Sequence, residues 1–146
     1  MGRRLAGWRV LSWSDRGRLL ACITALPLLH ASLAVLGYTH TRRAVESLSR
    51  HRSPRPATPD DIAAARNLAR LAAIAGHHGL VRATCLRQSL LLYAWLRRRG
   101  LAPCLQLGLR PDCGPTEAHA WVELDGQWLL QIDAGHQAFH RPSTPL

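Results

Sequence analysis

Cys85, His119 and Asp133 are the residues of this sequence whose types and order could do nucleophilic chemistry. Cys85 stands near the beginning of the strongly apolar segment 84–93, which is typical of a helix start. His119 lies in a strand-like run, and Asp133 ends the next such run. A thiol at a helix start, an imidazole on one strand and a carboxylate on the next are the parts of a cysteine nucleophile triad.

Cys85 is the predicted nucleophile because of its position. A free cysteine is often only a small buried hydrophobic residue. At a helix N-terminus, however, the partial positive charge favours the thiolate, and the backbone N–H groups of the first turn can form an oxyanion hole. The remaining cysteines lack that setting in the sequence: Cys22, Cys104 and Cys113.

His119 is the predicted general base and acid. Several other histidines fall in expected loops or near the end of the chain: His77, His78, His136 and His140. His119 is instead held on a predicted strand, late in the domain. Trp121 follows two residues later, so it lies on the same face of that strand and could shield the site from water.

The carboxylate that orients His119 is predicted from the turn between the two strands. Asp125 is explained as a turn residue, and Glu123 shares the His119 face but fits a solvated side chain as well. A plain two-residue turn at Asp125-Gly126 would direct Asp133 away from His119.

A three-residue turn with a bulge at Gly126 would instead place Asp133 on the His119 face. The triad hypothesis therefore predicts the bulged turn. Gln131 is the alternative orienting residue in the same register.

The elements that must position these residues can be predicted from periodicity and turn chemistry. The Cys85 helix is expected from about Thr84 to Arg99, and Gly100 is a good C-terminal stop. Alternation predicts a strand over 105–110, and two more strands over 118–124 and 127–133. Helices followed by a small antiparallel sheet predict an α+β domain.

Three segments are expected along the chain: an N-terminal helical region over 1–50, a Pro/Arg-rich connector over 51–57, and the core over 58–146. In the first segment Ser14-Asp15 predicts a helix N-cap, and Pro27 is expected to kink or divide the helix. The core begins with a Thr58 cap and Pro59 at the first helical position, and Gly76 is expected to stop that helix.

Residues 19–38 form a nearly continuous apolar run that is long enough to cross a membrane. Basic residues flank it on both sides, so no orientation is indicated. Pro27, His30 and Ser32 interrupt the run, which favours a buried or partner-facing helical pair. We expect a cytoplasmic protein, with membrane association through 19–38 left open.

Composition limits the function classes. The formal charge is +10, and all 19 basic residues are Arg. They are scattered rather than interleaved with aromatic residues, so nucleic-acid binding is not expected, and an acidic peptide or partner explains the charge as well. Four unevenly spaced cysteines do not form a disulfide framework or a C-x-x-C zinc site, so neither a metal nor a cofactor is expected.

With these residues in place, the chain resembles the transglutaminase-like leader peptidases of lasso-peptide biosynthesis, often called the B protein. The resemblance covers about residues 58–135. Four motifs carry it: CLRQSL at 85–90, LRRRG at 96–100, LGLR at 107–110, and HAWVE at 119–123 followed by Asp125-Gly126. Their order and spacing match as well.

The resemblance implies a transglutaminase/papain-like core in which a catalytic helix packs on a small antiparallel sheet. It implies a cysteine peptidase that cleaves the leader from a ribosomally made precursor, with Cys85 as nucleophile, His119 as base and acid, and Asp133 as the orienting group. It implies two further partners besides the precursor: a separate leader-recognition protein and an ATP-dependent macrolactam synthetase. The N-terminal helices are a candidate docking surface for the recognition protein.

Three alternatives stay open at this point. The same triad could pass an acyl group to an amine, as transglutaminases do. The chain could instead be a non-enzymatic basic adaptor that binds an acidic peptide or nucleic acid, with Cys85 packed in the core. A metal site built from Cys104, Cys113 and His119 ranks last.

Overall fold

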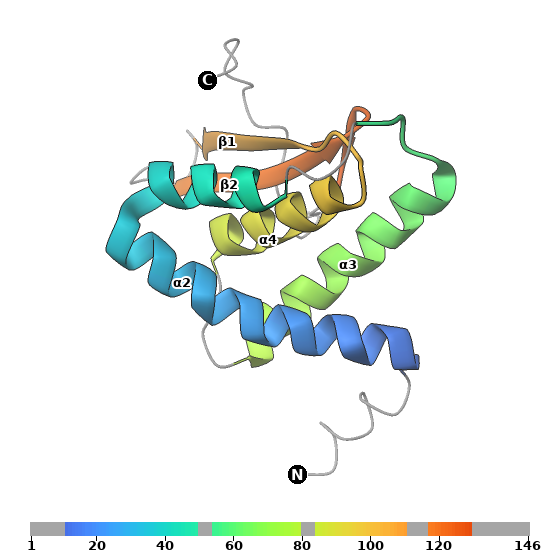
Figure 1. Cartoon of the computed structure of the whole chain (residues 1–146), viewed down its shortest axis with the longest axis horizontal. Coiled ribbons are helices and arrows are strands. Elements are labelled where there is room, and N and C mark those ends of the chain that lie inside the picture. Colours follow the sequence, from blue (N-terminus) through green and yellow to red (C-terminus); the bar gives the residue numbers. More distant parts are fainter. Residues whose placement is uncertain (1–10, 50–53, 80–83, 111–116, 130–146) are drawn as a thin grey trace.

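The computed structural model describes residues 11–49, 54–79, 84–110 and 117–129. Within these residues, three helices precede a three-stranded antiparallel sheet of order β1-β2-β3, as the α+β prediction requires (Figure 1). Helix α4 lies between the sheet on one side and helices α2 and α3 on the other. The elements are α2 (Trp13–Leu48), α3 (Pro59–His78), α4 (Cys85–Arg98), β1 (Cys104–Arg110), β2 (Glu117–Leu124) and β3 (Gln127–Trp128).

Helix α2 is a helical pair whose division lies at Gly37, where φ is 74° and ψ is 176°. The expected division at Pro27 is wrong, since Pro27 stands inside the helix. Gly37 breaks the helix because a positive φ suits glycine and is costly for other residues. Past the break the chain folds back, and the hydroxyl groups of Ser32 and Thr41 lie 2.9 Å apart in a hydrogen bond.

The start of α2 lies slightly earlier than the sequence indicated. Ser12 is the N-cap, and its hydroxyl accepts a hydrogen bond from the Asp15 backbone N–H at 3.2 Å. Ser14, the predicted cap with Asp15, is already inside the first turn. The Asp15 carboxylate accepts from the Asn67 side chain at 2.8 Å, and this contact fixes the first turn of α2 against α3. Side-chain hydrogen bonds from Ser12 and from Asn67 to the carboxylate hold the pKa of Asp15 below its ordinary value.

Helix α3 starts as predicted but ends later. Thr58 is the N-cap and Pro59 the first helical residue, and Thr58 forms a capping box with Asp61. Gly76 does not stop the helix: it is buried inside it, and the helix continues to His78. A glycine that packs against neighbouring elements is tolerated in a helix interior because packing outweighs its low propensity.

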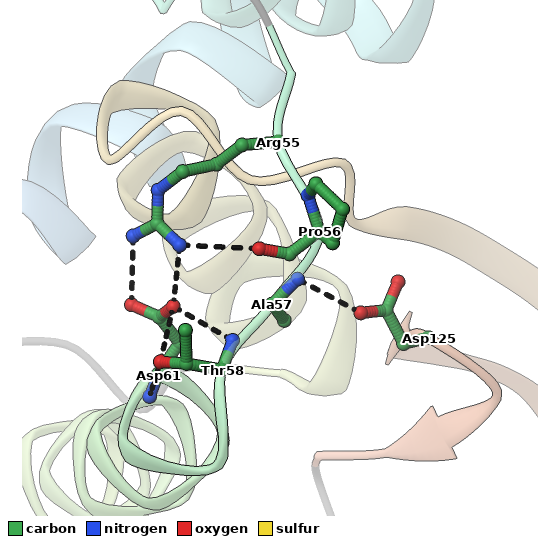
Figure 2. A network of polar contacts seen from close by, with 6 residues as sticks. All are labelled: Arg55, Pro56, Ala57, Thr58, Asp61 and Asp125. Carbon is green, nitrogen blue, oxygen red and sulfur yellow. Dashed lines mark hydrogen bonds and ion pairs between the residues drawn. The ribbon is translucent and has the colours of Figure 1, made fainter.

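The connector before α3 is tied to the distant β-hairpin, as Figure 2 shows. The Arg55 guanidinium donates two hydrogen bonds to Asp61, one of them 2.6 Å long. The Ala57 backbone N–H donates to the Asp125 carboxylate at 3.0 Å, across 68 residues of sequence. Residues 55–57 of the connector therefore link the start of α3 to the β2–β3 turn.

Helix α4 ends where the sequence predicted. Gly100 has a φ of 77°, and its N–H donates to the Arg97 carbonyl at 2.9 Å. The Leu101 N–H returns to the Leu96 carbonyl at 3.2 Å, which completes the C-terminal cap. Within the helix Leu90, Leu92 and Leu96 are fully buried and belong to a core that also includes side chains of α2, α3 and the sheet.

By length and composition alone, α2 passes the test for a helix that crosses a membrane. It also contributes Leu19, Cys22, Leu26 and Val45 to the core.

Candidate active site

Cys85 is the first residue of α4, so the structure confirms its predicted place at a helix N-terminus. Thr84 is the extended N-cap residue, with φ of −69° and ψ of 164°. Its carbonyl accepts hydrogen bonds from the backbone N–H groups of Arg87 at 3.1 Å and Gln88 at 3.2 Å. The Thr84 hydroxyl, in contrast, makes no capping hydrogen bond. The positive end of the helix therefore faces the partly buried Cys85 without a side-chain cap from Thr84.

The other two cysteines in the described residues occupy different environments. Cys22 is fully buried in the core, and burial raises the pKa of its thiol to about 11. Its thiol is therefore protonated and inert near neutral pH. Cys104 is exposed at the start of β1, where its sulfur accepts from the Gln106 side chain at 3.3 Å. Among these three, Cys85 alone stands at a helix start.

His119 lies on β2, the central strand of the sheet. Its partner across the β1–β2 ladder is Gly108, so no side chain stands directly opposite it on that strand. The imidazole stacks on the Trp121 ring, with ring centroids 6.3 Å apart and an interplanar angle of 13°. This contact confirms that His119 and Trp121 share a face of the strand.

The aromatic cluster continues from Trp121 to the hairpin partner strand. The Trp128 ring lies 5.8 Å from the Trp121 ring, tilted by 48°. Trp121 is 4% exposed and Trp128 is 45% exposed. The two tryptophans thus form an apolar wall beside the imidazole, and its outer ring is open to solvent.

A hydrogen bond from Ser89 joins the helix of Cys85 to the strand of His119. Ser89 is fully buried, and its hydroxyl donates to the Ala120 carbonyl at 3.0 Å. Ser89 lies one helical turn after Cys85 on the same side of α4, and Ala120 is the neighbour of His119. The hydrogen bond therefore fixes the first turns of α4 against the part of β2 that contains His119.

The sequence interpretation missed Ser89 as a positioning residue. Ser89 lies four residues before Tyr93 and seven before Leu96, on the buried face of the helix, and this spacing was the available signal because a polar group buried on such a face needs a hydrogen-bond partner. Gly108 was missed as well, since only the strand register shows that it faces His119.

The bulged turn predicted from the triad hypothesis is wrong. Glu123 pairs with Trp128 and Leu124 with Gln127, so Asp125 and Gly126 form a plain two-residue turn. Both turn residues have positive φ, 47° and 77°, which is the type I′ conformation that Asp-Gly favours. The register argument for Asp133 is thereby lost.

The candidate carboxylates separate into three cases. Asp125 accepts the hydrogen bond from the Ala57 backbone, which supports its interpretation as a structural turn residue. Glu123 is four residues from His119 along β2, so their Cα atoms are about 13 Å apart by strand geometry. At that separation the carboxylate cannot contact the imidazole directly. Asp133 and its alternative Gln131 lie outside the described residues.

The metal alternative finds no support in the described part of the chain. Cys104 lies opposite Glu123 in the sheet register, whereas Gly108 lies opposite His119. This offset of four residues separates Cys104 from His119 by about 13 Å along the sheet. Cys113 lies outside the described residues, and those described contain no cluster of three or more potential ligands among His, Cys, Asp and Glu.

Comparison with known proteins places the sequence of this chain in a family. A family model for the transglutaminase-like superfamily matches residues 28–144, which is most of the chain. No curated protein and no solved structure gives a significant match. A transglutaminase-like domain indicates a cysteine peptidase or acyl-transferase type of activity, in agreement with a cysteine at the start of α4 and a histidine on β2, the strand that packs against α4. The chain belongs to the transglutaminase-like superfamily.

Proposed function

We propose that this protein is a cysteine peptidase that removes the leader from a ribosomally made lasso-peptide precursor. The observation that supports the peptidase chemistry is the Ser89–Ala120 hydrogen bond, because it joins the helix that begins at Cys85 to the strand residue next to His119. The motifs at 85–90, 96–100, 107–110 and 119–123 support the choice of substrate class through their resemblance to the lasso leader peptidases.

In this proposal the Cys85 thiolate attacks the carbonyl carbon at the junction of leader and core. The tetrahedral oxyanion is stabilised by backbone N–H groups at the start of α4. The C–N bond then breaks, His119 protonates the leaving amine of the core peptide, and the leader remains bound to Cys85 as a thioester. His119 next takes a proton from water, which hydrolyses the thioester and releases the leader.

Trp121 and Trp128 have a supporting role in this scheme. The buried Trp121 ring stacks on His119 and limits the rotation of the imidazole, and the more exposed Trp128 ring offers an apolar contact for substrate. Asp133 is the proposed orienting group for His119, with Gln131 as its alternative. Asp133→Asn and Gln131→Ala, compared for activity, distinguish them.

The proposed partners follow from the same resemblance. A separate leader-recognition protein would present the precursor, and an ATP-dependent macrolactam synthetase would take the released core peptide. Neither metal nor cofactor takes part in the proposed steps.

The test is incubation of the protein with the precursor and the recognition protein encoded beside it, followed by mass spectrometry. We expect a leader-sized product with wild type, and none with Cys85→Ala or His119→Ala. Cys104→Ala is the matched control, because it removes an exposed thiol at the start of β1 rather than at the start of α4, and it should keep full activity. A product formed by Cys85→Ala would overturn the proposal.

The acceptor of the acyl group is read in the same experiment. In water enriched in heavy oxygen, hydrolysis places one heavy oxygen atom in the new carboxylate of the leader. A leader joined to an added primary amine, with no free acid formed, would instead establish acyl transfer.

A further inference from the structure

The first segment of α2 presents a continuous apolar face to solvent. Its exposed residues recur at helical spacing and form a line along the helix, here named the outer stripe: Trp13, Leu20, Thr24, Leu28, Ala31 and Val35. Trp13 is 84% exposed, Leu28 72% and Val35 81%. Because 22 residues separate its ends, the stripe is about 33 Å long. Large apolar side chains in one contiguous line indicate an interaction surface rather than ordinary surface composition.

The single polar side chain of the outer stripe does not interrupt its apolar character. The Thr24 hydroxyl donates to backbone carbonyls of its own helix, those of Ala21 at 3.0 Å and Leu20 at 3.2 Å. The stripe can therefore enter an apolar environment without leaving that hydroxyl unsatisfied. Residues 19–41 also contain no Asp, Glu, Lys or Arg.

The opposite face of the same segment is already occupied by the protein. Leu19, Cys22 and Leu26 are buried in the core shared with α3 and α4. The Asp15 carboxylate, on this inner side, is hydrogen-bonded to Asn67 of α3. To cross a bilayer, α2 would have to leave these contacts, whereas lying on a bilayer surface leaves all of them in place.

Basic residues stand at both ends of the stripe. Arg16 and Arg18 flank its beginning, and Arg42 and the exposed Arg43 follow its end, past the break at Gly37. Arg18 is paired with Asp15 and Arg42 with Glu46, so Arg16 and Arg43 supply basic charge beyond these two ion pairs. The Arg16 guanidinium lies over the exposed Trp13 ring, 4.7 Å from its centroid, so an aromatic ring and a cation are held together at the start of the helix. A tryptophan paired with arginine beside an apolar helix face suits the boundary between lipid headgroups and acyl chains.

From these observations we infer that α2 docks this protein in the plane of an anionic membrane surface, with the outer stripe inserted at the level of the headgroups. The basic flanks and the formal net charge of +10 complement anionic lipid. A second copy of the chain is a poorer occupant. Parallel or antiparallel pairing of two α2 helices would bring basic ends against basic ends and oppose association.

The inference is independent of the peptidase proposal, and its test uses the full chain. We would measure flotation of the protein with vesicles of phosphatidylcholine alone and with vesicles that also contain phosphatidylglycerol. Wild type should float with the anionic vesicles, and Cys85→Ala should float equally well. Leu28→Glu should weaken binding by about tenfold or more, because it loses apolar burial and adds a like charge to the lipid.

Leu48→Glu is the matched control. Leu48 is 70% exposed, nearly the same as Leu28, but it lies in the second segment of α2, past the break at Gly37. Figure 1 shows that this second segment turns back from the first. The substitution changes the net charge equally and should leave flotation close to that of wild type. Lipids with brominated acyl chains should quench part of the tryptophan fluorescence, and Trp13→Phe should remove that part.

Three results would overturn the inference. The first is a folded wild-type protein that floats with neither kind of vesicle. The second is equal binding by wild type and Leu28→Glu, which would assign lipid attraction to the arginines without the stripe. The third is a lipid-free dimer that Leu28→Glu dissociates and Leu48→Glu does not, which would assign the stripe to a second copy.

Discussion

Helices α3 and α4 both begin after a threonine, yet their first turns are built differently. At the start of α3 the Thr58 hydroxyl accepts from the Asp61 N–H at 3.3 Å, and the Asp61 carboxylate accepts from the Thr58 N–H at 2.9 Å. Arg55 then pairs with the same carboxylate. At the start of α4 the Thr84 hydroxyl makes no capping bond, and the first turn contains no acidic residue. We name these the closed start of α3 and the open start of α4.

The difference separates stability from chemistry. A closed start satisfies the backbone donors of the first turn with side chains of the chain itself, and it stabilises the fold. At the open start, neither the Thr84 hydroxyl nor an acidic side chain of the first turn caps the helix end at Cys85. In the proposed peptidase that position is where a thiolate and an oxyanion must be stabilised by the same helix end.

Closing the open start should have the largest effect. In Thr84→Asp the new carboxylate would accept a hydrogen bond from the first turn of α4 and place a negative charge beside Cys85. We expect the free energy of unfolding to rise by about 0.5–1 kcal/mol. Leader release should slow about 100-fold, because the added charge disfavours the thiolate and competes with the oxyanion.

Urea unfolding and single-turnover leader release measure the two effects of Thr84→Asp. Thr58→Asp is the matched control at the closed start, and it should change leader release less than about twofold, since that start lies outside the site. Full activity of Thr84→Asp would show that the open start of α4 has no part in catalysis.

Loosening the link between α4 and β2 should have the next largest effect. Ser89→Ala removes the buried hydrogen bond to the Ala120 carbonyl, and we expect a loss of about 1–2 kcal/mol in the free energy of unfolding. The kcat for leader release should fall more than KM changes, because the relative position of Cys85 and His119 is altered.

Ser32→Ala provides the comparison for Ser89→Ala. It removes the hydrogen bond to Thr41 at the fold of α2, on another element. Its loss of stability should come without a loss of kcat under conditions where the protein is folded. If Ser89→Ala also keeps its kcat, the Ser89 hydrogen bond is structural only.

The two threonines themselves should differ in a direct stability measurement. Thr58→Ala should lower the free energy of unfolding by about 1 kcal/mol, the usual cost of removing an N-cap side chain. Thr84→Ala should lower the free energy of unfolding by only a few tenths of a kcal/mol, because the Thr84 hydroxyl makes no capping hydrogen bond. Equal shifts of the urea midpoint in the two variants would contradict the distinction between closed and open starts.

The parts of the molecule that follow local rules were predictable from sequence. The Thr58-Pro59 start of α3 and the Gly100 stop of α4 depend on nearby residues, and both were predicted correctly. Asp125-Gly126 also follows a local rule, the type I′ turn, but a bulge was predicted because the triad hypothesis required one. At this turn the backbone preference of Asp-Gly predicted the turn type better than the triad hypothesis did.

Contacts between distant segments could not be predicted. Ser89 with Ala120, Ala57 with Asp125 and Asn67 with Asp15 each depend on how packed elements approach in space. Periodicity indicates which face of a helix is buried, but not which carbonyl or carboxylate the face will meet. The candidate site was therefore predicted as a set of residues, while the link that positions them needed the structure.

The smallest expected effect is a pH dependence of stability that belongs to the closed start alone. Hydrogen bonds from Arg55 and from the Thr58 backbone and hydroxyl hold the pKa of Asp61 well below its ordinary value of 3.8. A carboxyl whose pKa is lowered by folding stabilises the protein above its ordinary pKa, and this contribution is lost as pH falls toward the lowered value. We therefore expect the free energy of unfolding to decrease from about pH 5 downward.

Urea unfolding of Asp61→Asn and Asp60→Asn at several pH values shows which carboxyl group causes the pH dependence of stability. Both residues lie in the first turn of α3, but only Asp61 is bound by Arg55 and Thr58. Asp61→Asn should flatten the acid side of the stability profile, and Asp60→Asn should preserve its slope. Asp15, whose pKa is also lowered, leaves a residual slope in both variants. If the free energy of unfolding falls with the same slope in wild type and Asp61→Asn, the hydrogen bonds to Asp61 do not cause the loss of stability at low pH.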